Sequence, residues 1–378
     1  MRKAIVRYYQ KTDKFLWLLC FLAAGISLVL LYGILQSGYN AYLDISNRNL
    51  LVQAAAFGLG AVGAVVISLI DYNFVKKLWY LHSAAVYGLV LLTFFIGVGV
   101  AERADDKRWL VIPLININLQ PAELLKLSFI LTFALHISKL EENLNRLSSI
   151  LTLVAHAAIP VLLIHFQGDD GSALLIAGIA VTMLFFAGIR WYYIAGAAAM
   201  AAVATPFLWM YVINDFQKTR ILTLIHQATA DPLGDYYQQY QAKVAIAMGG
   251  ATGVGLTNTK HIYVPEMHND FIFSFLCESF GLMGALGVLL LMTAICLKLL
   301  YNSSLADDKY GACVCVGVFA MFAFQIIINI GMNLSLLPVI GNTFPFLSYG
   351  GTSAATSFLA FGLALSIYMR RKSDLFFD

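Results

Sequence analysis

Two ionisable residues interrupt an apolar segment in the first half of the chain. Glu123 and Lys126 stand in QPAELLK, and their spacing places them on one face of a helix, where they can form an ion pair. Pro121 suits the first turn of a helix, so Glu123 would lie near the positive end of the helix dipole. In an outward-facing cleft, Lys126 could bind a phosphate or pyrophosphate. A pair that only neutralises itself near the outer surface fits the sequence equally well.

A carboxylate stands where a polar loop meets another apolar segment. Asp270 lies in HNDFIF, and Asp is a favoured helix N-cap, which explains its position. An ionised carboxylate at such a boundary is also a good general base if a substrate hydroxyl can reach it. Glu266 and His268 could orient this carboxylate, or they could be loop-packing residues. The sequence alone leaves both interpretations open.

Further charges lie at other predicted boundaries. Asp169 and Asp170 stand in QGDDGSA, where at least one is expected to cap a helix. Three arginines occupy three different loops: Arg48, Arg108 and Arg220. Together they could converge as an anion-binding cluster, although each alone is more typical of a solvated charge.

Other conspicuous residues have structural explanations. Trp109 is more typical of the aromatic belt of a membrane interface than of a substrate platform. The run GGATGVG follows no strand, so it favours close backbone packing or tight turns over a dinucleotide site. The five cysteines fall in apolar stretches without metal-ligand spacing and are expected to be buried.

The elements that position these residues are indicated by composition. Of 378 residues, 60% are hydrophobic and 12% are charged, with a mean hydropathy of +0.78. A typical soluble domain is about a quarter charged. Forty-five charged side chains (24 basic and 21 acidic) are too few for a soluble protein of this size. A soluble enzyme, a disordered protein and a nucleic-acid binder are therefore excluded, and a polytopic membrane protein is predicted.

A helix needs about 20 apolar residues to cross a bilayer. Ten segments qualify, near residues 15–34, 50–70, 79–99, 121–138, 149–166, 172–188, 192–213, 271–299, 310–331 and 351–369. The first is expected to span rather than to be a removed signal peptide. Period-2 alternation and internal repeats are absent, which disfavours a β-barrel and an inverted-repeat transporter. The predicted fold is one all-α transmembrane domain over 1–378.

The distribution of Lys and Arg predicts the orientation. With the N-terminus inside, the inner segments hold fifteen basic residues, including Lys372, and the outer loops hold eight, including Arg103; Lys126 completes the 24. Both termini are therefore predicted to be cytoplasmic. The long loop 214–270 then lies outside, between helices 7 and 8, and a loop of this length usually carries function.

Three long segments resemble one known family. They are RW with QPAELLK (108–109 and 120–126), GVGLTNTKHIYVPEMHNDFIFSFLCESFGLMG (253–284) and NIGMNLSLLPVIGNTFPFLSYGGTS (329–353). In these segments the chain resembles the bacterial SEDS family (shape, elongation, division and sporulation), which contains RodA and FtsW. Its short N-terminus looks more like RodA. The family has ten transmembrane helices and polymerises lipid II outside the cytoplasmic membrane, together with a class B penicillin-binding transpeptidase.

The resemblance implies an inverting peptidoglycan glycosyltransferase of the bacterial cytoplasmic membrane, with Asp270 as its essential carboxylate. It implies an outward-facing cavity that contains Glu123, Lys126, Arg48, Arg108, Asp169 and Arg220. The supporting residues would be Glu266, His268, Trp109, Gln120 and Ser348. No organic cofactor is implied, and a divalent cation (Mg²⁺ or Mn²⁺) is left open.

Departures from the family pattern are also visible, and one of them is an atypical stretch between Pro338 and Pro345. The family usually has Thr where this chain has Asn269, and a PDLG-like sequence where this chain has GDDG at 168–171. The departure at 168–171 leaves the choice between Asp169 and Asp170 open, with Asp169 favoured by position. None of these departures removes a charged residue from the predicted site.

The residues and the resemblance together suggest one mechanism. Asp270 would take the proton of the GlcNAc 4-hydroxyl of lipid II, which attacks the anomeric carbon of the strand's terminal MurNAc. Lys126, held by Glu123, and one or more arginines would stabilise charge on the departing polyprenyl pyrophosphate. The alternatives are a lipid II flippase and a non-catalytic scaffold for a transpeptidase. Transport predicts polar residues at the midplane and on both sides, whereas the unusual charges here cluster at the outer boundary, which favours the enzyme.

Overall fold

The structure is a computed structural model that describes residues 2–99, 107–112, 117–211, 213, 215–227, 231, 233–234, 236–258 and 260–371. Within these residues, ten helices are long and apolar enough to cross a membrane. They are α2 (Lys14–Gln36), α3 (Asn47–Leu69), α5 (Trp79–Ile96), α6 (Pro121–Leu140), α7 (Leu147–Phe166), α8 (Asp170–Ala187), α9 (Trp191–Tyr211), α12 (Ile272–Ser304), α13 (Lys309–Asn333) and α14 (Gly351–Tyr368). The predicted all-α class and all ten predicted spans are confirmed.

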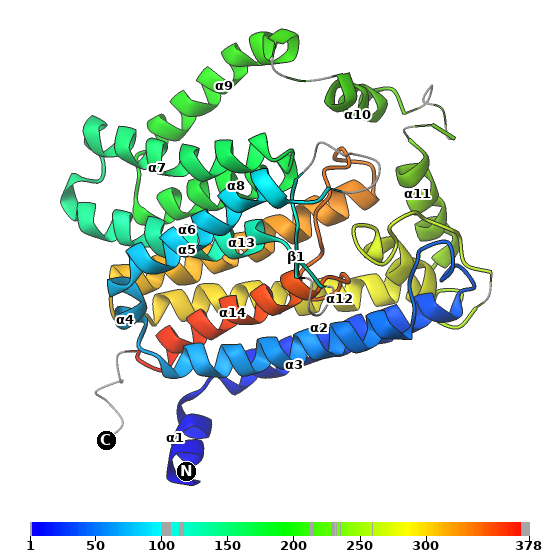
Figure 1. Ribbon diagram of the computed structural model, residues 1–378, viewed down its shortest axis with the longest axis horizontal. Helices are drawn as coiled ribbons and strands as arrows, with labels where there is room; N and C mark the ends of the chain where they lie inside the picture. The colour runs from blue at the N-terminus through cyan, green and yellow to red at the C-terminus, as the bar shows by residue number, and fades with distance from the viewer. Residues whose placement is uncertain are drawn as a thin grey trace.

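The two ends of the bundle differ. Figure 1 shows the short helices α1 (Arg2–Lys11) and α4 (Tyr72–Lys77) at one end, together with the last turn of α14. The other end carries α10 (Asp215–Ile225) and α11 (Tyr237–Gly249), so the predicted long loop contains two helices. It also carries the antiparallel pair β1 (Leu110–Ile112) and β2 (Ile117–Leu119), while η1 (Glu141–Asn143) follows α6 at the first end. Arg103 and Lys372, which were counted for the orientation, lie outside the described residues.

The centre of the bundle is formed by α6, α13 and α14, which are the most buried spans. α6 packs against α5, α7, α8 and α13, so its side chains are enclosed on several sides. α9, at the upper edge of Figure 1, contributes no residue to the core. All five cysteines are buried, as predicted.

An aromatic cluster fixes the non-helical segment between α13 and α14. The ring of Phe346 lies 5.2 Å from Phe358 and 5.2 Å from Phe361, both on α14, and 5.7 Å from Phe322 on α13. Such ring pairs contribute about 0.5–1.5 kcal/mol each beyond their buried area. The segment is thereby anchored in the core although its backbone is irregular.

α12 is interrupted at Gly281, whose φ is +64° and ψ −163°. The glycine-rich run GGATGVG (249–255), which begins with the last residue of α11, supplies the missing backbone partners. The amide of Val254 donates to the carbonyl of Glu278 at 2.9 Å, and the amide of Leu282 donates to the carbonyl of Gly250 at 2.9 Å. The break is therefore satisfied by another backbone segment, as hydrocarbon surroundings require.

This pairing explains the glycines of the run. A Cβ on Gly249 would lie 2.0 Å from the carbonyl oxygen of Cys277, and one on Gly253 would lie 2.2 Å from that of Ser279. Only glycine allows the two backbones to approach this closely. The prediction of close backbone packing is confirmed for these two positions.

Replacing Gly281 by Ala is expected to destabilise the fold. At its positive φ a side chain costs about 1–3 kcal/mol, and the new Cβ would lie 2.5 Å from the backbone of Ala251. Gly287→Ala is the matched control, because a Cβ there meets nothing within 4 Å and Ala favours a helix by about 1 kcal/mol over Gly. Thermal unfolding of both variants in detergent tests this. Equal midpoints for the two variants would contradict the proposed role of the break.

Candidate functional site

The side chain of Asp270 does not cap α12. Phe271 occupies the N-cap position and makes no side-chain capping bond. The amide of Ser274 instead donates to Oδ1 of Asn333, at 3.0 Å. The interpretation of Asp270 as a helix cap is therefore wrong, because a side chain from α13 already satisfies this end of the helix.

Side chains from two segments hold the backbone carbonyls of Asn269 and Asp270. Asn329 and Asn333 in α13 both donate from Nδ2 to the carbonyl oxygen of Asp270, at 2.9 and 3.0 Å. Ser348 donates from Oγ to the carbonyl of Asn269 at 2.6 Å, so this predicted supporting residue is a positioning residue. The two asparagines are not among the predicted site residues, although Asn at positions i and i+4 of an apolar span is a usable signal.

The carboxyl group of Asp270 lies in a crowded electrostatic environment. Burial, followed by the charges of Glu266 and Asp169, raises its pKa, whereas Arg108 and Arg220 lower it, and the net value is about 7. The side chain keeps part of its surface accessible to solvent. Within the described residues, no hydrogen bond to the carboxylate is formed. A carboxyl group with this pKa can accept a proton near neutral pH.

The two neighbouring aspartates at α8 have different surroundings. Asp169 caps α8: its Oδ1 accepts from the amide of Ser172 at 3.1 Å, and its Oδ2 accepts from Nε2 of Gln120 at 3.0 Å. Asp170 instead meets His165, with 2.6 Å between Oδ1 and Nδ1. The structure thus places Asp169, rather than Asp170, with Gln120 and beside Asp270.

Glu123 and Lys126 form the ion pair that their spacing predicts, with 2.7 Å between Oε1 and Nζ. Pro121 stands in the first turn of α6, as predicted. Both charged residues are buried, and Lys126 exposes only 1% of its surface. In this structure Lys126 therefore does not present its ammonium group to a ligand, and a direct phosphate contact would require the first turns of α6 to open.

Two of the three candidate arginines come together. Arg108, two residues before β1, donates from Nη2 to the carbonyl of Gly168. Arg220, in α10, donates from Nη1 to the carbonyl of Val339. Both act on the charge of Asp270 from different loops. Both arginines therefore favour the ionised form of Asp270.

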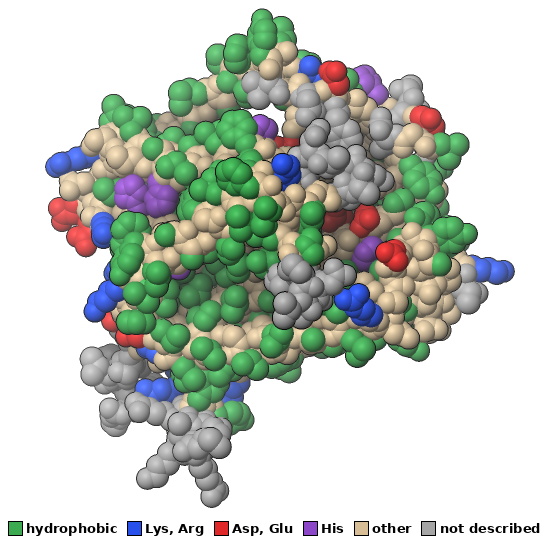
Figure 2. All heavy atoms as spheres, viewed as in Figure 1, with side chains coloured by type: hydrophobic (Ala, Val, Ile, Leu, Met, Phe, Trp, Pro, Cys, Tyr) green, Lys and Arg blue, Asp and Glu red, His purple; other side chains and the backbone are tan. Residues whose placement is uncertain are grey.

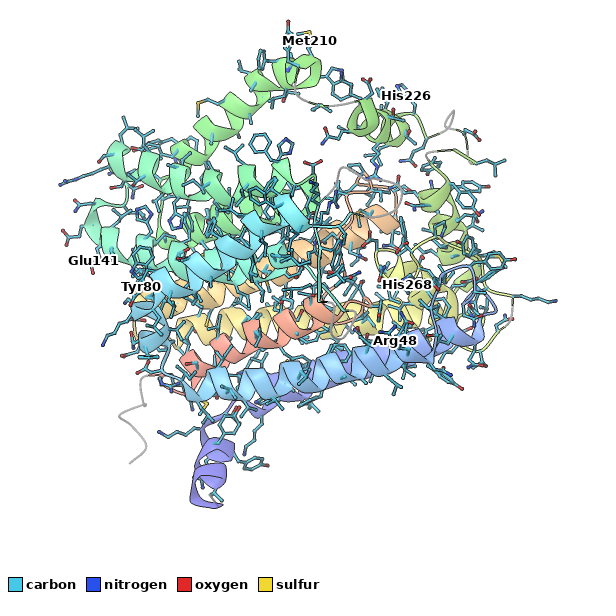
Figure 3. All side chains as sticks on the ribbon, viewed as in Figure 1. Arg48, Tyr80, Glu141, Met210, His226 and His268 are labelled. Carbon is cyan, nitrogen blue, oxygen red and sulfur yellow. The ribbon has the colours of Figure 1, made fainter. Side chains whose placement is uncertain are left out.

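Arg48 and Trp109 are two more of the predicted residues. Arg48 is exposed in the first turn of α3, and within the described chain no contact joins it to Asp270 (Figure 3). Trp109 forms a backbone bridge with Val98, next to Arg108. Figure 2 shows acidic, basic and histidine side chains gathered right of centre, on a face that is otherwise largely hydrophobic.

Glu266 and His268 shape the turn before Asp270. The Oε2 atom of Glu266 accepts from Nδ2 of Asn269 at 2.7 Å, and it lies 4.0 Å from Nε2 of His268. Burial lowers the pKa of His268, although the nearby Glu266 opposes this effect. His268 is therefore favoured as a neutral residue packed against Tyr349, with 5.8 Å between the ring centroids.

The described residues do not fit a resident divalent cation. Within them, no three His, Cys, Asp or Glu side chains come together as ligands. Both carboxylate oxygens of Asp169 already accept hydrogen bonds from protein groups.

The fold and the site define a class: a ten-span membrane protein with ionisable side chains gathered at one end of α6, α8 and α12. Residues 13–373 match the family of FtsW, RodA and SpoVE, described as "Cell cycle protein". The chain belongs to this family, and it is a multi-pass protein of the cytoplasmic membrane. The SEDS resemblance is thereby confirmed.

Curated relatives match over most of their length. The chain is 32% identical over 318 residues to the probable peptidoglycan glycosyltransferase FtsW of Geobacter metallireducens, covering 83% of each chain. It is 31% identical over 298 residues to the peptidoglycan glycosyltransferase MrdB of Escherichia coli K12, covering 78% of each. It is also 30% identical to the stage V sporulation protein E of Bacillus subtilis, covering 82% of this chain and 84% of that one.

Two solved structures share the fold. A chain described under "Structural coordination of polymerization and crosslinking by a peptidoglycan synthase complex" has a TM-score of 0.81 at 24% identity, covering 96% of this chain and 99% of that chain. The rod shape determining protein RodA of Thermus thermophilus has a TM-score of 0.70 at 22% identity, covering 96% and 98%. These structures support the ten-helix architecture.

Replacing Asp270 by Asn is expected to stabilise the protein at pH 8. The pKa of Asp270 in the folded protein, about 7, lies above the ordinary aspartate value of 3.8. The folded state therefore binds this proton more tightly, and its stability falls as pH rises from about 4 to 7. The Asn variant avoids this loss, which is at most about 4 kcal/mol.

The measurement is the thermal midpoint of wild type and Asp270→Asn between pH 4.5 and 8. The difference should grow with pH and become small near pH 4.5. Wild-type and Asp270→Asn midpoints that stay parallel over this range would refute a raised pKa.

Proposed function

We propose that this chain is a peptidoglycan glycosyltransferase that polymerises lipid II into glycan strands on the outer face of the cytoplasmic membrane, in support of cell shape, elongation or division. The observation that carries the proposal is the Asp270 carboxyl group, which is held by its backbone, is not used as a cap and has a pKa of about 7. The names of the Geobacter and Escherichia relatives support the same activity.

The proposed reaction is one inverting glycosyl transfer. The 4-hydroxyl of the GlcNAc of lipid II attacks the anomeric carbon of the terminal MurNAc of the growing strand, and Asp270 takes the hydroxyl proton. The bond from that carbon to the pyrophosphate oxygen breaks on the opposite face, and polyprenyl pyrophosphate leaves. The donor carries its own activated bond, so no nucleotide is needed.

Cations beside Asp270 serve the departing pyrophosphate in this proposal. Arg108 and Arg220 act on the same carboxylate from two loops, and fixed cations are most effective where charge develops in the transition state. Lys126, held by Glu123, would add positive charge only after local opening, because the pair is enclosed. Asp169 and Gln120 would hold the α6 and α8 ends together.

A class B penicillin-binding transpeptidase is the proposed partner, since polymerised strands must be crosslinked. The structural relative with a TM-score of 0.81 comes from a peptidoglycan synthase complex in which polymerisation and crosslinking are coordinated. Lipid II and the polyprenyl-linked strand would reach the site from the surrounding membrane lipid, because their tails are hydrocarbon.

Asp270→Asn is expected to abolish polymerisation, because the amide cannot accept the hydroxyl proton. Loss of a general base typically costs 10²–10⁴-fold in rate. The assay incubates purified protein and its transpeptidase partner with labelled lipid II and resolves the glycan products on a gel. Asp170→Asn is the control, since Asp170 pairs with His165 instead. Equal product from wild type and Asp270→Asn would exclude Asp270 as the base, and absence of product from wild type would favour a flippase or scaffold.

Arg220→Gln is expected to slow polymerisation by about 10²-fold, the usual size for one preorganised donor. Arg220 also lowers the pKa of Asp270, so its removal should move the rising limb of the pH–rate profile, which lies near pH 7 in wild type, to higher pH. Lys218→Gln, in the same helix, is the matched control because Lys218 pairs with Asp215. If both variants give the wild-type profile, Arg220 does not act on the reacting groups.

A further inference from the structure

A second group of polar side chains lies at the opposite end of the bundle from Asp270. A cavity of about 530 Å³ opens between α5, α6 and α7. Three aromatic residues of α5 form one wall: Trp79, Tyr80 and Tyr87. The polar groups come mainly from the second half of α6 and from α7: Thr132, His136, Lys139 and His156. The proposed transferase reaction uses none of these residues.

The polar wall of the cavity is a built hydrogen-bonded unit. The Nδ1 atoms of His136 and His156 lie 3.1 Å apart, and the two rings stack with 5.3 Å between their centroids. Thr132 meets the other ring nitrogen of His156, with 3.2 Å between Oγ1 and Nε2. Two facing imidazole nitrogens require one N–H donor and one acceptor. The histidines are thus held in fixed orientations by partners on two helices.

The cavity lies toward the end of the bundle where α5 begins and α6 ends. Trp79 begins α5 and Lys139 stands in the last turn of α6. Both positions are at the end of the bundle that carries α1 and α4. The charge pattern predicts that this end is cytoplasmic. Figure 3 shows Tyr80 at the end of the bundle remote from His268, and Figure 2 shows histidine side chains at the surface over the same end. Trp and Tyr prefer the membrane interface, and Lys extends toward it.

We propose that this cavity binds one anionic phospholipid of the cytoplasmic leaflet. Its phosphate would contact Lys139 and the ring of His136, and an acyl chain would lie along the aromatic wall of α5. Basic pockets between helices on the cytoplasmic side favour anionic headgroups. The volume falls within the range of about 300–1,000 Å³ of ligand sites. The acidic residues of the following turn, Glu141 and Glu142, do not line the cavity.

The mixed lining distinguishes this ligand from others of similar charge. A soluble phosphate would use the basic group but would leave the three aromatic rings without a partner. A zwitterionic phospholipid fits the rings, but its ammonium group opposes Lys139. An anionic phospholipid matches both walls, and its binding depends on no group near Asp270.

Native mass spectrometry of the purified full-length chain in detergent tests the proposal. Phosphatidylglycerol and phosphatidylcholine with identical acyl chains are added at equal concentration. We expect one phosphatidylglycerol to be retained at several-fold higher occupancy than phosphatidylcholine. Lys139→Gln should remove most of this preference. Lys309→Gln is the matched control, because Lys309 is an exposed lysine in the first turn of α13 on the same side and does not line the cavity.

A second variant fills the cavity without changing any charge. Ala84 lines it, so Ala84→Trp should also lose the retained phosphatidylglycerol while its thermal midpoint and its polymerisation of lipid II stay near wild type. Retained activity with lost lipid would separate this proposal from the proposed function. Equal retention of the two phospholipids by wild type, or unchanged retention in both variants, would overturn it. Displacement of phosphatidylglycerol by equimolar undecaprenyl phosphate or by inorganic phosphate would also overturn the assignment to a phospholipid.

Discussion

Peptide groups at membrane depth must find partners within the protein, and the polar end of this bundle depends on that constraint. Between α13 and α14 the chain is irregular, so side-chain amides replace the helical bonds. Gln53 donates from Nε2 to the carbonyl of Ser348 and accepts the amide of Gly350, both at 3.1 Å. Gln239 donates to the carbonyls of Met332 and Leu337. Buried amides from distant helices thus hold the loops around the site.

The same constraint explains the chemistry of Asp270. Because Asn329 and Asn333 satisfy the backbone of this turn, the carboxylate is not required as a structural acceptor. It remains half-buried among charges of both signs, and its pKa rises. Ionisation of Asp270 lowers the stability of the folded state. The same raised pKa makes the carboxylate a proton acceptor near neutral pH. A rigid scaffold is needed to hold a group in such surroundings.

Local sequence patterns predicted the elements, and long-range contacts decided the roles. The ten spans follow from runs of apolar residues, and Glu123 and Lys126 meet because their partners lie within one helical turn. The capping role predicted for Asp270 failed because the actual cap, Asn333, lies 59 positions beyond Ser274 in sequence. α10 and α11 were missed because they are too short to span. Arg48 is exposed, in agreement with its interpretation as a solvated charge.

Because Lys126 is buried, its ammonium group is less available to a substrate than the arginines are. Glu123 lies 2.7 Å from its ammonium group, so at a distance the two charges act as a dipole, with a much weaker field than a single cation. Separating a buried pair leaves a charge without compensation, which costs about 3–5 kcal/mol. Arg108 and Arg220 already act on Asp270 without such a change. The arginines are therefore better placed for the first contact with pyrophosphate, and Lys126 can join only where substrate binding supplies the energy to open α6.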